Sequence, residues 1–167
     1  AQSSGSATVG HGLGVAPDVI ITKSRTLSSN WYTYHQSIGE NGWIKLESTG
    51  AATTGSSAAW GGTAPTSSVF TYGSGLVNQG DQVFYAFSEV AGYSKFGSYT
   101  GNGSSDGTFV FLGFKPALII MKATNGRNWL IMDNKRSAEA GANPNLYALE
   151  ANNNNVEDTA GNNGNID

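Results

Sequence analysis

Residues that could do acid–base chemistry are few and widely spaced in this sequence. The two histidines, His11 and His35, have no acid at the spacing of a catalytic triad or a metal pair. Glu47, Asp81 and Glu89 are candidates for glycoside hydrolysis, but nothing in the sequence places two carboxylates about 5–9 Å apart, as that reaction requires. We therefore expect no catalytic residues and no enzyme.

Cofactor and metal sites are not predicted either. Gly12-Leu13-Gly14 begins like a dinucleotide-binding motif, but Pro17 stands at the third glycine position and the segment precedes a strand, so we interpret it as a turn. The chain has no cysteine for a disulfide or a thiolate zinc site. Acids in the Asn-rich tail, residues 152–167, could bind Ca²⁺, but they lack EF-hand spacing and favour a polar loop.

Aromatic side chains are the best candidates for ligand binding, because their rings can pack on the apolar faces of sugars. Trp31 and Trp129 recur in equivalent sequence positions, as shown below, and are expected in the core. Trp43 and Trp60 do not recur, and Trp60 lies in a loop, where its ring needs either a packing partner or a ligand. With Tyr72, they form the predicted ligand-binding set.

The elements that must position these residues are predicted to be β-strands. Short apolar runs rich in Val, Ile, Phe, Tyr and Trp alternate with clusters of Gly, Asn, Ser and Pro, which is typical of an all-β protein. The predicted strands cover residues 19–23, 31–35, 43–47, 69–72, 82–89, 95–99, 108–112, 118–122, 129–133 and 146–150. The strand at 82–89 is apolar on both faces, which predicts a central position in its sheet.

Turn residues agree with this reading. Asn41-Gly42, Asn102-Gly103 and Asn125-Gly126 each place two residues that tolerate a positive φ between predicted strands. Asn125-Gly126 is the best candidate for a hairpin, because it separates the predicted strands at 118–122 and 129–133.

An internal repeat is the most specific signal in the sequence. Residues 14–23 (GVAPDVIITK) and 113–122 (GFKPALIIMK) share the Gly, the Pro, the Ile-Ile pair and the Lys in register. Asn30-Trp31 then corresponds to Asn128-Trp129, and the period is about 99 residues. The expected architecture is two tandem copies of a β-sandwich-type unit, at residues 1–92 and 93–167. The second copy is incomplete, because it lacks a counterpart of QVFYAFSEVAGY, so a longer polypeptide or a partner chain is expected to supply those strands.

Four motifs carry a resemblance to a known family. They are Tyr-Thr-Gly-Asn-Gly at 99–103, the Gly-Phe-x-Pro strand at 113–122, the Asn-Trp strand at 128–133 and Tyr-Ala-Phe-Ser-Glu at 85–89. Together they resemble uncharacterised repeat β-domains of phage virion proteins, especially tail-fibre-like and adhesion-like proteins of marine phages. The resemblance implies a virion structural protein and carries no catalytic residues to this chain.

Composition narrows the partners. Charged residues make up 13% of the chain and its net charge is −3, so no basic stripe is available for nucleic acid. No apolar run reaches the ~20 residues of a membrane span. We expect a non-catalytic tail-fibre-like protein or surface decoration, virion-bound or extracellular, assembling with identical chains or other virion proteins and contacting host glycans. The alternatives are a bacterial lectin-like carbohydrate-binding module and a glycan depolymerase domain.

Overall fold

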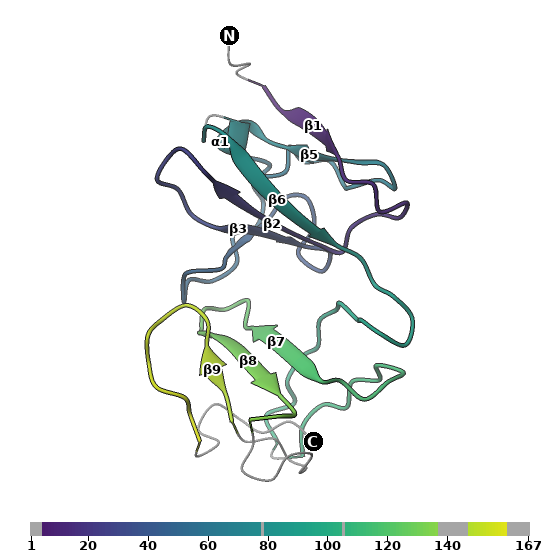
Figure 1. Ribbon diagram of the computed structural model, residues 1–167, viewed down its shortest axis with the longest axis vertical. Coiled ribbons are helices and arrows are strands. Elements are labelled where there is room, and N and C mark those ends of the chain that lie inside the picture. Colours follow the sequence, from purple (N-terminus) through teal and green to yellow (C-terminus); the bar gives the residue numbers. More distant parts are fainter. Residues whose placement is uncertain (1–4, 78, 105, 137–146, 160–167) are drawn as a thin grey trace. The chain divides into compact units, whose positions relative to one another are not determined.

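The computed structural model describes residues 5–77, 79–104, 106–136 and 147–159 (Figure 1). Apart from one short helix, α1 (Ser74–Val77), the regular elements of these residues are β-strands. The prediction of an all-β protein is therefore confirmed. None of the described residues lies in a helix with the length and hydropathy that a membrane crossing needs.

The chain divides into two compact units that do not follow the sequence in a simple order. The first unit consists of Ala1–Ile44 and Thr53–Phe114, and the second consists of Lys45–Ala52 and Lys115–Asp167. The second unit thus takes a short segment from within the first half of the chain. The expected boundary after residue 92 describes a repeat in the sequence and stays a prediction.

The first unit contains two antiparallel sheets. A two-stranded sheet pairs β1 (Ala7–Gly10) with β5 (Val69–Tyr72). A four-stranded sheet has the order β4-β3-β2-β6, and its strands are β2 (Val19–Ser24), β3 (Tyr32–His35), β4 (Ile44–Lys45) and β6 (Gln82–Phe87). Figure 1 shows β1 beside β5 and β6 along β2. Neither sheet closes on itself, so the unit is sandwich-like and has open edges.

The alternation of side chains along β2 creates the core of the first unit. Ile20, Thr22 and Ser24 are buried, whereas Val19 and the other residues between them are only partly buried. Since side chains of a strand point to opposite faces in turn, every second residue meets the inner face. Tyr34 lies opposite Ile20 on β3 and is buried on the same face.

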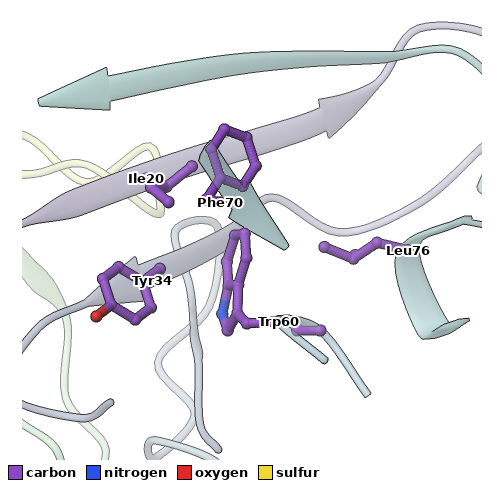
Figure 2. Packing of buried hydrophobic residues seen from close by; sticks show 6 residues of the cluster. Ile20, Tyr34, Trp60, Phe70 and Leu76 are labelled. Atoms are coloured by element: carbon purple, nitrogen blue, oxygen red, sulfur yellow. The ribbon is translucent and has the colours of Figure 1, made fainter. Parts of the chain in front are cut away.

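Aromatic rings fill the space between the two sheets of this unit. The buried cluster contains Ile20, Tyr34, Ala59, Trp60, Phe70 and Leu76 (Figure 2). Tyr34 meets Trp60 edge to face at 5.8 Å between ring centroids, and Phe70 meets Phe84 in the same way at 5.1 Å. Such edge-to-face pairs are worth about 0.5–1.5 kcal/mol beyond the burial of their area. The core therefore joins β2, β3, β5, β6 and the loop that carries Trp60.

The predicted central position of the strand at 82–89 is wrong. β6 stands at the end of the four-stranded sheet, and β2 is its one neighbour among the strands that the structure describes. Its apolar residues on both faces are real, but only the inner set is needed for the core. The outer set, which includes Tyr85 and Phe87, is left at the surface.

The predicted strands at 95–99 and 108–112 do not form in the described part of the chain. A looped segment stands there, in which the Asn102 side-chain amide donates to the Asp106 carbonyl at 2.8 Å and the Thr108 hydroxyl donates to the Thr100 carbonyl at 2.7 Å. Phe109 is 85% exposed. An alternating pattern forms a strand only where a neighbouring strand accepts its hydrogen bonds and a core accepts its apolar face.

The second unit is built on one hairpin. β7 (Leu118–Lys122) pairs with β8 (Trp129–Asp133), which pairs in turn with β9 (Leu149–Glu150). Gly126 has a φ of +93°, which only glycine adopts without strain, so the predicted hairpin turn at Asn125-Gly126 is confirmed. Met132 on β8 and Ala148, just before β9, are buried.

Segment Lys45–Ala52 is tied to the hairpin of the second unit by side-chain and backbone hydrogen bonds. The indole N–H of Trp129 donates to the Lys45 carbonyl at 2.9 Å, and the Lys122 ammonium donates to the Ser48 carbonyl at 3.2 Å. The Ala52 amide donates to the Thr124 carbonyl at 2.8 Å. Trp129 is buried, as the sequence predicts for this recurring tryptophan, and its polar atom is satisfied inside the unit.

Candidate functional site

The three predicted ligand-binding residues all belong to the core region of the first unit. Trp60 is 1% exposed and lies inside the aromatic cluster (Figure 2). Trp43 and Tyr72 are partly buried and pack against that cluster. Trp43 contacts Tyr32 edge to face at 6.0 Å, and Tyr72 contacts Phe84 at 5.6 Å. The structure thus brings the three residues to one core rather than to a shared opening at the surface.

The three residues differ in burial, and therefore in whether their rings can contact a ligand. The ring of Trp60 needs a packing partner, which Tyr34 supplies, and a buried ring cannot contact a ligand in this conformation. Trp43 is held by its backbone as well, because it exchanges hydrogen bonds of 3.0 and 2.9 Å with Thr53. A binding role for the exposed parts of Trp43 and Tyr72 stays a prediction.

The two histidines make local contacts that explain them structurally. The His11 Nε2 donates to the Thr66 carbonyl at 3.1 Å, and its Nδ1 accepts the Leu13 amide at 3.2 Å. The His35 Nδ1 accepts the Ser37 amide at 3.1 Å. Burial lowers the pKa of His35, against the opposing effect of Asp18. Both rings therefore organise turns.

Carboxylates near β6 are also engaged in local structure. Asp18 accepts the backbone amide of Glu89 at 2.6 Å, and Glu89 forms an ion pair with Lys95 at 2.8 Å. These contacts join the start of β2 to the segment after β6. Among the described residues, no three His, Asp or Glu side chains form a group that could hold a metal ion.

The outer face of the four-stranded sheet is the candidate functional site. Tyr85 is 47% exposed and Phe87 is 45% exposed, and both come from β6. In the sheet register Tyr85 lies opposite Ile21 and Phe87 opposite Val19. Side chains directly opposite each other in adjacent strands share a face, so these four residues make one apolar surface. We call it the outer face.

A cation lies on the same side of β2 as this apolar surface. Lys23 follows Ile21 at the two-residue spacing of one strand face, and its ammonium lies 6.0 Å from the centroid of the Trp31 ring. That distance is within the range of a cation–π contact. The lysine ammonium also donates to the Ser29 carbonyl at 2.5 Å. The outer face therefore combines exposed aromatic rings with a positioned charge.

The sequence predicts a central strand for Tyr85 and Phe87 and therefore does not single them out as surface residues. Their alternation with Phe84 and Ala86 predicts a strand that is apolar on both faces, and β6 is such a strand. Only the position of β6 at the end of its sheet turns this pattern into exposed surface. A face of aromatic and aliphatic side chains offers packing area to a protein or a sugar.

Comparisons with known proteins give a family. Neither the curated proteins nor the solved structures include a match to this chain. One family model matches residues 1–167, that is, the whole chain, and its description is a domain of unknown function. The chain therefore belongs to the DUF7483 family.

Proposed function

We propose that this chain is a non-catalytic virion structural protein, of tail-fibre-like or surface-decoration type, which assembles with identical chains or other virion proteins. The observation that carries the assembly part is the outer face, where Tyr85 and Phe87 stand about half exposed beside Val19 and Ile21. Exposed apolar patches of this kind mark interaction surfaces in folded proteins. The virion context rests on the resemblance of the repeat motifs.

The energy available from the outer face supports an assembly role. An aromatic side chain buries about 150–250 Å², so a half-exposed ring has about 100 Å² left to bury. At about 25 cal/mol per Å² this is about 2–3 kcal/mol for each ring, before the cost of association. Two such rings per chain are comparable with the few anchor residues that dominate natural interfaces.

Self-association of the purified chain tests the proposal. Sedimentation velocity over a range of concentrations should reveal oligomers, and the double variant Tyr85→Ser, Phe87→Ser should shift them to monomer. Tyr93→Ser is the matched control, because Tyr93 is still more exposed and lies outside the strands. Thermal unfolding should be alike in all three proteins. A chain that stays monomeric at every concentration would contradict assembly with identical chains.

Carbohydrate binding is the second candidate, and the same rings favour it. Tyr85 and Phe87 present exposed aromatic faces on a sheet, which is how rings pack on sugars. A glycan microarray with the chain and the double variant distinguishes the two functions. Binding that the double variant loses, without any change in oligomeric state, would favour the carbohydrate-binding module over the structural protein. Shortening of a bound glycan would favour the depolymerase alternative.

A further inference from the structure

The hairpins of the two units share one register. Val19 lies opposite His35 in the β2–β3 pair, and Leu118 lies opposite Asp133 in the β7–β8 pair. These are the pairs that the sequence repeat makes equivalent, because Val19 aligns with Leu118 and the Asn-Trp dipeptides align with each other. β7 therefore occupies in its hairpin the place that β2 occupies in the first unit.

A side-chain contact follows the same equivalence. The Lys23 ammonium donates to the Ser29 carbonyl, and the Lys122 ammonium donates to the Arg127 carbonyl. In both hairpins the accepting residue stands two positions before the recurring tryptophan. The likeness thus extends from the strand pairing to an individual hydrogen bond.

The second edge of β2 is occupied by β6. The Arg25 amide donates to the Asp81 carbonyl, in register with the pairing of Ser24 with Gln82. Because hydrogen-bonding residues alternate along an antiparallel strand, the backbone groups of Ile21 also face β6. β6 therefore covers this edge of β2 and brings Tyr85 and Phe87 next to Ile21 and Val19.

The corresponding edge of β7 has no strand beside it in the described part of the chain. The Asn134 amide donates to the Ala117 carbonyl, in register with the β7–β8 pair, so Ala117 and every second residue after it face β8. The backbone groups of Leu118 and Ile120 then point to the other edge. That edge is equivalent to the one which β2 offers to β6.

Side-chain exposure shows the difference that a β6-type strand makes. Leu118 is 56% exposed and Ile120 is 54% exposed. The equivalent residues on β2, Val19 and Ile21, are partly buried, so they are less exposed than Leu118 and Ile120. In the first unit Phe87 lies opposite Val19 and Tyr85 lies opposite Ile21, and no described strand places such side chains beside Leu118 and Ile120.

We propose that the outward edge of β7 is a docking site for one antiparallel strand with the residue pattern of β6. The occupant carries aromatic side chains at two alternate positions, as Gln-Val-Phe-Tyr-Ala-Phe does. In the register of the first unit its tyrosine lies opposite Ile120 and its second phenylalanine opposite Leu118. Main-chain hydrogen bonds supply the attachment, and the two aromatic side chains supply the selectivity. This inference holds whether or not the protein belongs to a virion.

Hydrogen–deuterium exchange of the whole chain, with and without a synthetic peptide of residues 80–91, tests the docking site. The peptide should slow exchange in fragments covering β7 by about tenfold or more, since exchange requires opening of the new hydrogen bonds. The control peptide carries serine in place of the residues corresponding to Tyr85 and Phe87. It should protect β7 much less, because it keeps the main chain and loses the aromatic contacts.

Substitution on β7 distinguishes specific docking of the peptide from non-specific binding. Ile120→Thr keeps a β-branched residue and should weaken the effect of the peptide about tenfold. Leu27→Thr is the control, because Leu27 is similarly exposed but lies outside the strands. Equal protection by both peptides, or none by either, would overturn the proposal. Protection of β7 that grows with protein concentration in the absence of peptide would also overturn it, in favour of a second copy.

Discussion

Replacing Trp60 by alanine separates a core residue from a ligand-binding one. Trp60 is 1% exposed and packs edge to face on Tyr34, so the variant loses the burial of a large ring and that aromatic contact. Substitutions of buried Phe or Trp by Ala cost about 3–5 kcal/mol, because transfer energy is lost and a cavity remains. A loss of this size is a large share of the stability of a typical domain, about 5–15 kcal/mol.

Urea denaturation provides the measurement. With a slope of about 2 kcal/mol per molar urea, the midpoint for the first unit should fall by about 1.5–2.5 M. Trp60→Phe offers a milder comparison. Within the described part of the chain the buried indole N–H of Trp60 has no hydrogen-bond partner. Phenylalanine removes this donor, whose unsatisfied burial costs about 1–3 kcal/mol.

The relative order of these two variants is the decisive result. Trp60→Phe should lie much closer to the wild-type protein than Trp60→Ala does. If Trp60→Ala unfolds within about 1 kcal/mol of wild type, Trp60 is not a core residue and the assignment of the cluster is wrong. Its ring would then be free to serve as part of a ligand site.

Two further predictions concern backbone space and pH. Gly73→Ala should destabilise the first unit, because an added Cβ would lie 2.6 Å from the Ser57 carbonyl oxygen. The control is Gly97→Ala, which has open space around the added Cβ and should unfold at the wild-type urea midpoint. Equal midpoints for the two variants would contradict the packing at Gly73. The pKa of Glu150 lies below its ordinary value of 4.5, and the largest cause is the hydrogen bond from the Asn153 side chain, followed by those from other asparagines. A lowered carboxyl pKa stabilises the fold above the unfolded value, and that contribution is lost as pH falls from 4.5 through the folded pKa. The Glu150→Gln variant should therefore lose less stability than wild type between neutral pH and about pH 3 in urea titrations, and parallel pH profiles would refute this role.

Local sequence patterns predicted the strands of the two hairpins well. The strands expected at 19–23 and 118–122 agree with β2 and β7 to within one residue, because each is an apolar run with an Ile-Ile pair between turn residues. The hairpin turn at Asn125-Gly126 followed from the same local chemistry. Such features depend on neighbours in the sequence, so one segment contains the information that defines them.

Pairing between distant segments could not be predicted in the same way. The pattern of β6 fits a central or an end strand equally well, and only the complete sheet decides between them. The sequence pattern predicts a strand at 108–112, yet no strand of the described residues pairs with this segment, and Phe109 and Phe111 are exposed. Pairing in a sheet joins segments that are distant in the sequence. Which strands become neighbours is decided only when the whole sheet packs.

The candidate site illustrates the same limit. Residue type selects Trp43, Trp60 and Tyr72 as ligand-binding candidates, and in the structure all three belong to or pack against the aromatic core. The sequence pattern around Tyr85 and Phe87 predicts a central strand, whereas the structure leaves both side chains exposed. Whether an aromatic residue faces the core or the solvent depends on the neighbouring strand, which residue type cannot reveal.

The origin of Lys45–Ala52 has a consequence for the order of events during synthesis. The Lys45 and Ser48 carbonyls precede their donors, Trp129 and Lys122, by 84 and 74 residues. At about 5–20 residues per second the donors are synthesised about 4–17 s later. Over that interval the carbonyls of Lys45 and Ser48 have neither Trp129 nor Lys122 to receive hydrogen bonds from. The two segments of the first unit are therefore synthesised while Lys45–Ala52, which lies between them, still lacks its partners. The second unit completes its fold only after the later part of the chain has been made.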